Sequence, residues 1–125
     1  MNSKTSTKEK FNVITIAETN FSANMTADFE KLTYNVANEN THLVINLEEV
    51  ETIAPEICHT LAKVQQAFYE KDCSFVICCL APEVEAIFEK EQLMELMNIT
   101  PTESEAWDIV NMEEIERDLM KDFEE

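Results

Sequence analysis

Glycine is absent from this chain of 125 residues, although average usage of about 7% would give roughly nine. The phosphate-binding loops of nucleotide enzymes, both the dinucleotide fingerprint and the P-loop, need glycines at fixed positions. The sequence therefore excludes both kinds of site. Any turn that requires a positive φ angle must use Asn, Asp or another residue that accepts the left-handed conformation at a cost.

Basic residues are scarce. Nine Lys and Arg residues stand against 26 Asp and Glu residues, for a formal net charge of −17 at pH 7. Nucleic acid is excluded as a partner, because its binding depends on neutralising phosphates with Lys and Arg. An anionic membrane surface is disfavoured for the same reason. The charge is better explained by a basic protein partner or by solubility alone.

Long apolar runs are also missing. The longest, residues 75–81, is far shorter than the roughly 20 residues that a membrane-spanning helix needs. The chain does not open with the charged and then apolar segment of a secretory signal. We therefore expect a soluble cytoplasmic protein.

No pair of cysteines has C-x-x-C spacing. In a cytoplasmic protein we expect reduced, mostly buried thiols, and we predict neither a metal site nor a cofactor. Two of the cysteines are adjacent in an apolar run, where a strand would point their side chains to opposite faces. The four cysteines are Cys58, Cys73, Cys78 and Cys79.

The length fits one domain, since domains usually hold roughly 100–200 residues. Residues 1–10 are polar and predict a flexible leader, which leaves 11–125 as a single domain. Residues 11–17 predict a strand that is largely apolar on both faces. A helix should follow from Thr26, whose hydroxyl can cap it.

The centre of the chain predicts strand, helix and strand. Residues 43–47 and 75–80 are apolar runs, and Pro55 suits the first position of the helix between them. Such a unit implies a right-handed crossover between parallel strands. We therefore predict an α/β fold: a small mixed or parallel β-sheet with helices packed on it. The inward positions of the central helix are Ile57, Leu61, Val64 and Phe68.

The C-terminal part predicts a helix from Pro82, a short edge strand at Ile99 and a last helix capped by Thr102. Residues 102–125 hold ten acidic and two basic residues. This acidic face is most simply solvated; a docking surface for a basic partner is the alternative. We expect the inward stripe of the last helix to be Ala106, Ile109, Met112, Ile115, Leu119 and Phe123.

The start of the central helix carries the candidate site. Glu56 either complements the helix dipole or presents a fixed charge to a partner. His59 follows one turn later, and a Glu/His pair can do acid–base chemistry when a further group positions it. The sequence supplies no such group, so we predict no enzyme. The alternative is a small ligand-binding or enzymatic domain that uses Glu56 and His59. Cys58 is expected to be buried and inert.

Residues 41–110 resemble a STAS domain, the fold of bacterial anti-sigma-factor antagonists. The resemblance rests on residues 43–47 followed by 50–53, the helix through Leu61, residues 75–84, and the pair 105–106 at the start of the last helix. Each piece alone is degenerate, and their order and spacing carry the likeness. The resemblance implies a STAS-like fold.

The functional motif of that family is Asp-Ser-Ser-Gly, whose second serine is phosphorylated by an anti-sigma-factor kinase. The corresponding positions here are Ala54, Pro55, Glu56 and Ile57. The resemblance therefore implies that no phospho-acceptor stands at the usual position, which Glu56 occupies. It implies a protein partner, such as a GHKL-type kinase or a regulatory assembly. Self-association, as a homodimer or scaffold, is a further alternative. The predicted partner-binding residues are Pro55, Glu56, His59, Thr60 and Lys63.

Overall fold

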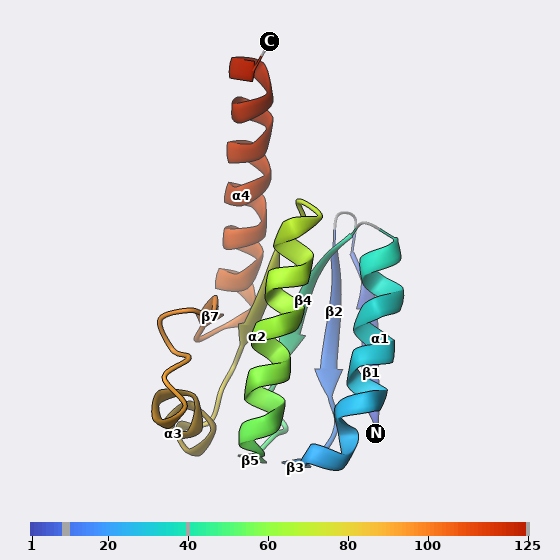
Figure 1. The fold of residues 1–125 in the computed structure, drawn as a ribbon, viewed down its shortest axis with the longest axis vertical. Coiled ribbons are helices and arrows are strands. Elements are labelled where there is room, and N and C mark those ends of the chain that lie inside the picture. Colours follow the sequence, from blue (N-terminus) through green and yellow to red (C-terminus); the bar gives the residue numbers. More distant parts are fainter. Residues whose placement is uncertain (9–10, 40, 125) are drawn as a thin grey trace.

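A mixed five-stranded sheet forms the centre of the molecule. The computed structural model describes residues 1–8, 11–39 and 41–124, the last four by their backbone only. The strand order is β1-β2-β4-β6-β7; β1 is antiparallel to β2, and the other neighbours are parallel (Figure 1). These strands are β1 Ser3–Thr7, β2 Phe11–Ile16, β4 His42–Asn46, β6 Phe75–Cys78 and β7 Ile99–Thr100.

Helices connect the parallel strands. The strand–helix–strand unit predicted from the sequence is present as β4, α2 and β6, with β4 and β6 parallel. A short 3₁₀ turn, η1 Ala23–Met25, precedes the first helix, and β3 (Asn20–Phe21) pairs with β5 (Thr52–Ile53) below the main sheet. The helices are α1 Thr26–Asn38, α2 Pro55–Glu70, α3 Pro82–Lys90 and α4 Glu103–Glu124.

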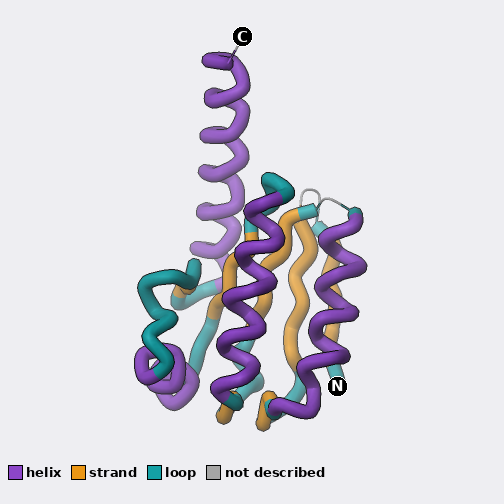
Figure 2. The backbone as a smooth tube through the Cα atoms, in the orientation of Figure 1, coloured by secondary structure: helices purple, strands orange, loops and turns teal. Residues whose placement is uncertain are grey.

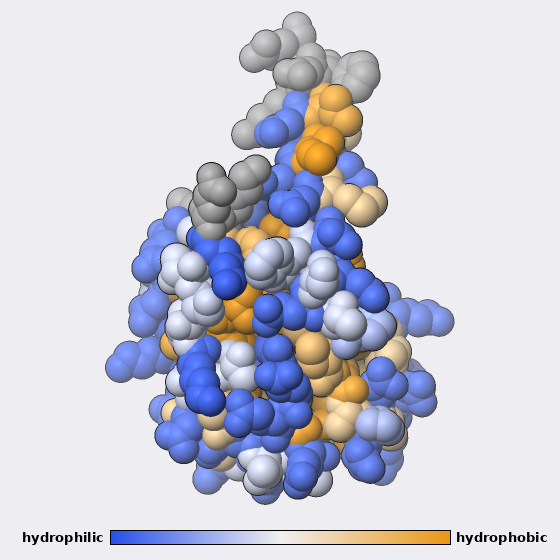
Figure 3. Space-filling view, turned by 180° about the vertical axis from the view of Figure 1, so that it is seen from behind, coloured by the Kyte–Doolittle hydropathy of each residue, from blue (hydrophilic) through white to orange (hydrophobic). Residues whose placement is uncertain are grey.

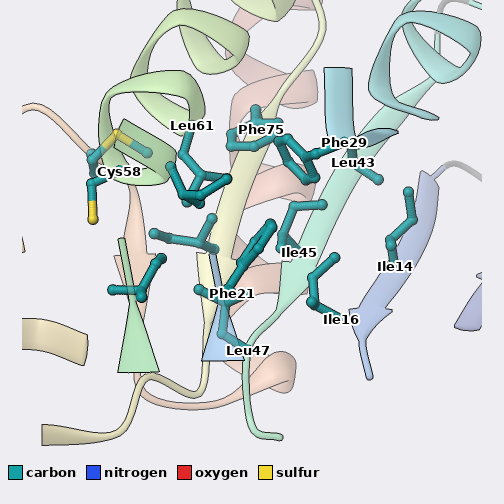
Figure 4. Close-up of a cluster of buried hydrophobic side chains, with 14 of the residues drawn as sticks. Ile14, Ile16, Phe21, Phe29, Leu43, Ile45, Leu47, Cys58, Leu61 and Phe75 are labelled. Atoms are coloured by element: carbon teal, nitrogen blue, oxygen red, sulfur yellow. The ribbon is translucent and has the colours of Figure 1, made fainter. Parts of the chain in front are cut away.

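The two faces of the sheet bury two separate clusters, because successive side chains of a strand alternate between faces. Helices α1 and α2 lie side by side on one face (Figure 2). The first turns of α4 cover the other face. All residues of β4 and β6 are consequently buried, as expected for inner strands of a parallel sheet. Figure 4 shows the larger cluster, which includes Ile14, Ile16, Phe21, Phe29, Leu43, Ile45, Leu47, Cys58, Leu61 and Phe75.

The polar start of the chain is not a leader, contrary to the sequence prediction. Ser3–Thr7 forms β1 and pairs with β2 along its whole length, from Ser3 opposite Ile16 to Thr7 opposite Asn12. All five side chains are exposed. An edge strand is held by backbone hydrogen bonds on one side only, so it can join the sheet without apolar side chains. Residues 9 and 10 of the expected leader lie outside the described residues.

The two predicted helix caps had different outcomes. Thr102 does cap α4, since its Oγ1 accepts the backbone N–H of Glu105 at 3.2 Å. Thr26 does not cap α1, because the helix already begins at Thr26 and Met25 occupies the cap position. The chain enters α1 through the 3₁₀ turn, and the Thr26 hydroxyl instead donates to the carbonyl of Ala23 at 2.8 Å.

The inward stripe predicted for α4 was wrong over most of its length. Ala106 is fully buried, but Met112, Ile115 and Leu119 are 59%, 60% and 54% exposed. The helix runs well past the edge of the sheet, so beyond its first turns there is no apolar surface for a stripe to cover (Figure 1). Val110 takes the buried position instead. The side chain of Phe123 lies outside the description.

Residues other than glycine do adopt positive φ, as the composition requires. Asp72, Cys79 and Gln92 have φ angles of 60°, 64° and 60°. Asp72 and Gln92 each follow the last turn of a helix, where the left-handed conformation lets the final backbone groups bond across the turn. Cys79 leaves the strand at this angle. Cys78 and Cys79 therefore contact the same cluster instead of opposite faces, which corrects the sequence prediction.

We predict that Gln92→Gly raises the free energy of unfolding by about 0.5–1 kcal/mol. Gln92 is exposed, and glycine removes the cost of a side chain at positive φ. Urea unfolding followed by circular dichroism measures the change. Gln92→Ala is the control and should not stabilise, because it keeps the Cβ atom. A glycine variant that is less stable than the parent chain would contradict this account of the turn.

Candidate functional site

The start of α2 is an exposed helix end next to the small β3/β5 pair. Ala54 is extended, with φ −75° and ψ 142°, and Pro55 is the first helical residue. The backbone N–H of Ala54 donates to the carbonyl of Phe21 at 2.9 Å, which fixes where the helix begins. Pro55 and Glu56 are exposed, whereas Ile57 is fully buried. The backbone hydrogen bond to Phe21 therefore fixes the start of the helix, while its first two side chains remain exposed to solvent.

Glu56 presents an unengaged carboxylate at this end. Among the described residues, no hydrogen bond or ion pair holds its side chain. The helix has no side-chain cap, so the first backbone N–H groups and the positive end of the dipole lie beside this carboxylate. A negative charge there stabilises the helix and remains available to a partner.

His59 contacts α3 instead of Glu56. Its Nε2 lies 2.9 Å from Oε1 of Glu91, just after the end of α3, and the side chains are 52% and 24% exposed. Among the described residues, no hydrogen bond or ion pair joins the side chains of His59 and Glu56. The alternative left open from the sequence, an enzymatic site that uses Glu56 and His59, therefore has no direct contact between these two side chains.

Thr60 and Lys63 lie one and two turns after Glu56 along the same side of α2. Thr60 is only 7% exposed, and its hydroxyl donates to the carbonyl of Glu56 at 3.0 Å. Both residues line a groove of about 480 Å³ between α1 and α2. Sequence reasoning missed this groove, because four of its ten lining residues come from α1. Its lining also includes Glu30, Tyr34, Ala37, Val64, Phe68 and Lys71.

The Cys58 thiol lies beneath the candidate surface and is fully buried. Burial raises its pKa to about 12, and the nearby Glu91 and Glu56 carboxylates add to the effect. A thiol with this pKa is almost entirely protonated at neutral pH and is a poor nucleophile. Burial also raises the pKa of the Cys78 and Cys73 thiols.

In the part of the chain that the structure describes, no three His, Cys, Asp or Glu side chains gather as metal ligands would. None of the helices formed by the described residues has the length and apolar character to cross a membrane.

Comparison with known proteins decides the family. A family model described as STAS domain matches residues 3–106. The chain belongs to the STAS domain family. The match begins at β1, which agrees with Ser3–Thr7 being part of the domain. Among curated proteins, none matches the chain in sequence.

Solved STAS-like structures share the fold. A protein from Thermotoga maritima, named as an anti-sigma factor antagonist, superposes with a TM-score of 0.74 at 17% identity, over 87% of this chain and 94% of its own. An anti-sigma-factor antagonist (STAS) domain protein from Planctomyces limnophilus gives a TM-score of 0.76 at 14% identity, over 87% and 97%. A serine-to-glutamate variant of Moorella thermoacetica RsbS gives 0.73 at 17%, over 89% and 96%.

We predict that the thiols of this STAS domain react with iodoacetamide at very unequal rates at pH 8. Cys58 should be protected because it is buried and its thiolate forms only near pH 12, whereas the partly exposed Cys79 should react first. Mass spectrometry of peptides after timed labelling gives the four rates, and labelling in urea gives the unfolded reference. Rapid native labelling of Cys58 would show that the start of α2 opens readily.

The raised pKa of Cys58 also predicts that the folded protein loses stability at high pH. A thiol that is held protonated in the folded protein favours folding fully below its unfolded pKa of about 8.5, and loses this contribution as the pH rises toward its folded pKa. For Cys58 the loss runs from about pH 8.5 to about 12. The urea concentration at the midpoint of unfolding, measured up to pH 11, should fall less steeply with pH in Cys58→Val than in the parent chain. Identical slopes in the two proteins would contradict this assignment.

Proposed function

We propose that this STAS domain is a non-enzymatic regulatory module that binds a protein partner through the exposed start of α2. The observation that carries the proposal is the anchored helix end at which Pro55 and the unengaged Glu56 carboxylate face solvent. The fold similarity to anti-sigma-factor antagonists supports the choice of a protein partner. The binding surface we propose comprises Pro55, Glu56, His59 and Lys63, with the buried Thr60 supporting it from below.

We further propose that phosphorylation does not switch this surface at the usual position. The resemblance to the family aligns the phospho-acceptor serine with Glu56, which has no hydroxyl. Glutamate carries about one negative charge, whereas phosphoserine carries roughly 1.5–2 and more acceptor oxygens. The nearest hydroxyl on the same helix, Thr60, is buried and bonded to the Glu56 carbonyl. At this position the surface therefore carries the permanent single negative charge of glutamate, instead of a larger charge that phosphorylation could add or remove.

The chemistry of this surface also defines the kind of partner. A GHKL-type kinase or a regulatory assembly is the partner class that the family resemblance implies. The carboxylate at position 56 calls for a donor on the partner, such as a Lys or Arg side chain, because complementary charges fix the orientation of a complex. The enzymatic alternative needs a positioned acid–base pair, and the contact of His59 with Glu91 does not supply one to Glu56.

We predict that Glu56→Lys weakens partner binding at least about tenfold, a loss of roughly 1.4 kcal/mol. The free energy of unfolding should change by less than about 1 kcal/mol, the scale of a helix-end charge. Affinity capture from a lysate of the source organism, read by mass spectrometry, identifies the partner, and titration calorimetry with the purified partner gives the affinities.

The chain offers a matched control in α3. Glu83 follows Pro82 in the first turn of α3 as Glu56 follows Pro55 in α2, and both glutamates are exposed. Glu83→Lys makes the same change in net charge and in helix-end charge at another place. Equal affinities for Glu56→Lys and the parent chain would reject the surface, and equal losses in both variants would indicate a general effect of charge.

A further inference from the structure

Beyond the sheet, the apolar side of helix α4 faces solvent instead of the body of the domain, the reverse of the sequence prediction. Its first turns bury Ala106 and Val110 against the sheet face that contains Val44 and Val76. The helix then continues past the sheet and projects into solvent (Figures 1 and 2). A helix end of this kind would normally be polar all round or covered by another element.

Polar contacts, and not apolar ones, orient α4 where it leaves the body. Glu113 accepts the Tyr69 hydroxyl hydrogen bond at 2.7 Å, and Arg117 Nη1 donates to Ser74 Oγ at 3.1 Å. Between them, Glu114 Oε1 lies 3.2 Å from Nε2 of the buried His42. These contacts come from the side of the helix that also carries Ala106 and Val110, so they fix the rotation of α4 about its axis.

This orientation turns the large apolar side chains of α4 to solvent. Each of Met112, Ile115 and Leu119 is two positions from Val110 or Arg117, which places it about 200° around the helix from the body. Their spacing of three and then four residues is that of an interhelical seam. Met120 is also 63% exposed, but it lies three positions after Arg117 and seven after Glu113, near the side of the helix that makes the polar contacts. We call Met112, Ile115 and Leu119 the outer seam.

The outer seam is the main exposed apolar surface of the described chain. It contains three of the six large hydrophobic side chains found exposed among the described residues; the other three are Tyr34, Leu96 and Met120. Figure 3 shows hydrophobic side chains gathered along one side of the projecting helix, with hydrophilic residues around them. Contiguous exposed apolar side chains with a polar rim mark interaction surfaces.

The charge around the seam specifies its occupant. Asp108, Glu116 and Asp118 are exposed next to it on α4. A second copy would bring the same acidic residues against these, and like charges across a helix pair oppose association. A partner helix with Lys or Arg beside its apolar stripe would form ion pairs instead.

We propose that the outer seam docks an amphipathic helix of a partner protein whose apolar stripe is flanked by Lys and Arg. This surface is separate from the start of α2, which lies at the opposite end of the molecule (Figure 1). The domain can therefore hold two partners at once, one at each end. The seam spans about two helical turns, so the contact is small and the complex is of the weak, transient class.

A designed peptide tests the proposal with the full chain. The probe is a fluorescent 21-residue helix with Leu at the seam positions and Lys at the flanking positions. A peptide of the same composition with its Leu residues dispersed around the helix is the control for general attraction to a chain of charge −17. Fluorescence anisotropy should show binding of the amphipathic peptide at least about tenfold tighter than the dispersed one, and added salt should weaken it.

The variant pair locates the site. Ile115→Ser/Leu119→Ser should lose at least about tenfold in affinity, while Leu96→Ser, a change at another exposed apolar residue, should leave it unchanged. Both seam residues are exposed, so the urea midpoint should stay that of the parent chain. Equal binding by the double variant, or equal binding of the two peptides, would overturn the proposal. So would a dimer in sedimentation equilibrium that the double variant abolishes, since a second copy would then be the occupant.

Discussion

The structure depends on two inner strands that are buried on both faces. Every residue of β4 and β6 lacks contact with solvent, or nearly so, and the strands pair in parallel from Leu43 opposite Phe75 to Asn46 opposite Cys78. Parallel strands need a crossover, and apolar side chains on both faces need a cover on each. Helices α1 and α2 provide one cover, and the first turns of α4 provide the other. The crossover from β4 to β6 begins beyond the carboxyl end of β4, and the start of α2, with Pro55 and Glu56 exposed, lies on this connection.

A buried histidine connects this sheet to the projecting helix. His42, the first residue of β4, accepts the backbone N–H of Ser74 at Nδ1 over 2.8 Å. The ring proton is therefore on Nε2, which points at Glu114 of α4. Arg117 reaches the Ser74 side chain from the same helix. The end of the sheet thus holds α4 through hydrogen bonds, which leaves its apolar side chains free on the far side.

The candidate surfaces at the two ends differ in kind. The start of α2 offers a single carboxylate on an anchored helix end, a small and specific feature. The outer seam offers an apolar area with acidic flanks, which is broader and binds its partner more weakly. Both carry negative charge, so the two partners that we propose would each present basic residues.

The sequence by itself determined the α/β pattern, the parallel crossover from residues 43 to 80, the edge strand at Ile99 and the STAS resemblance, because apolar periodicity and proline placement are local signals. It also determined that turns would use positive φ without glycine. The tertiary structure alone decided that Ser3–Thr7 joins the sheet, that His59 pairs with Glu91, and that Thr60 is buried. It also decided which side of α4 faces the body. Periodicity shows that Met112, Ile115 and Leu119 share a face, but only contacts with distant residues such as His42 and Ser74 fix the direction in which that face points.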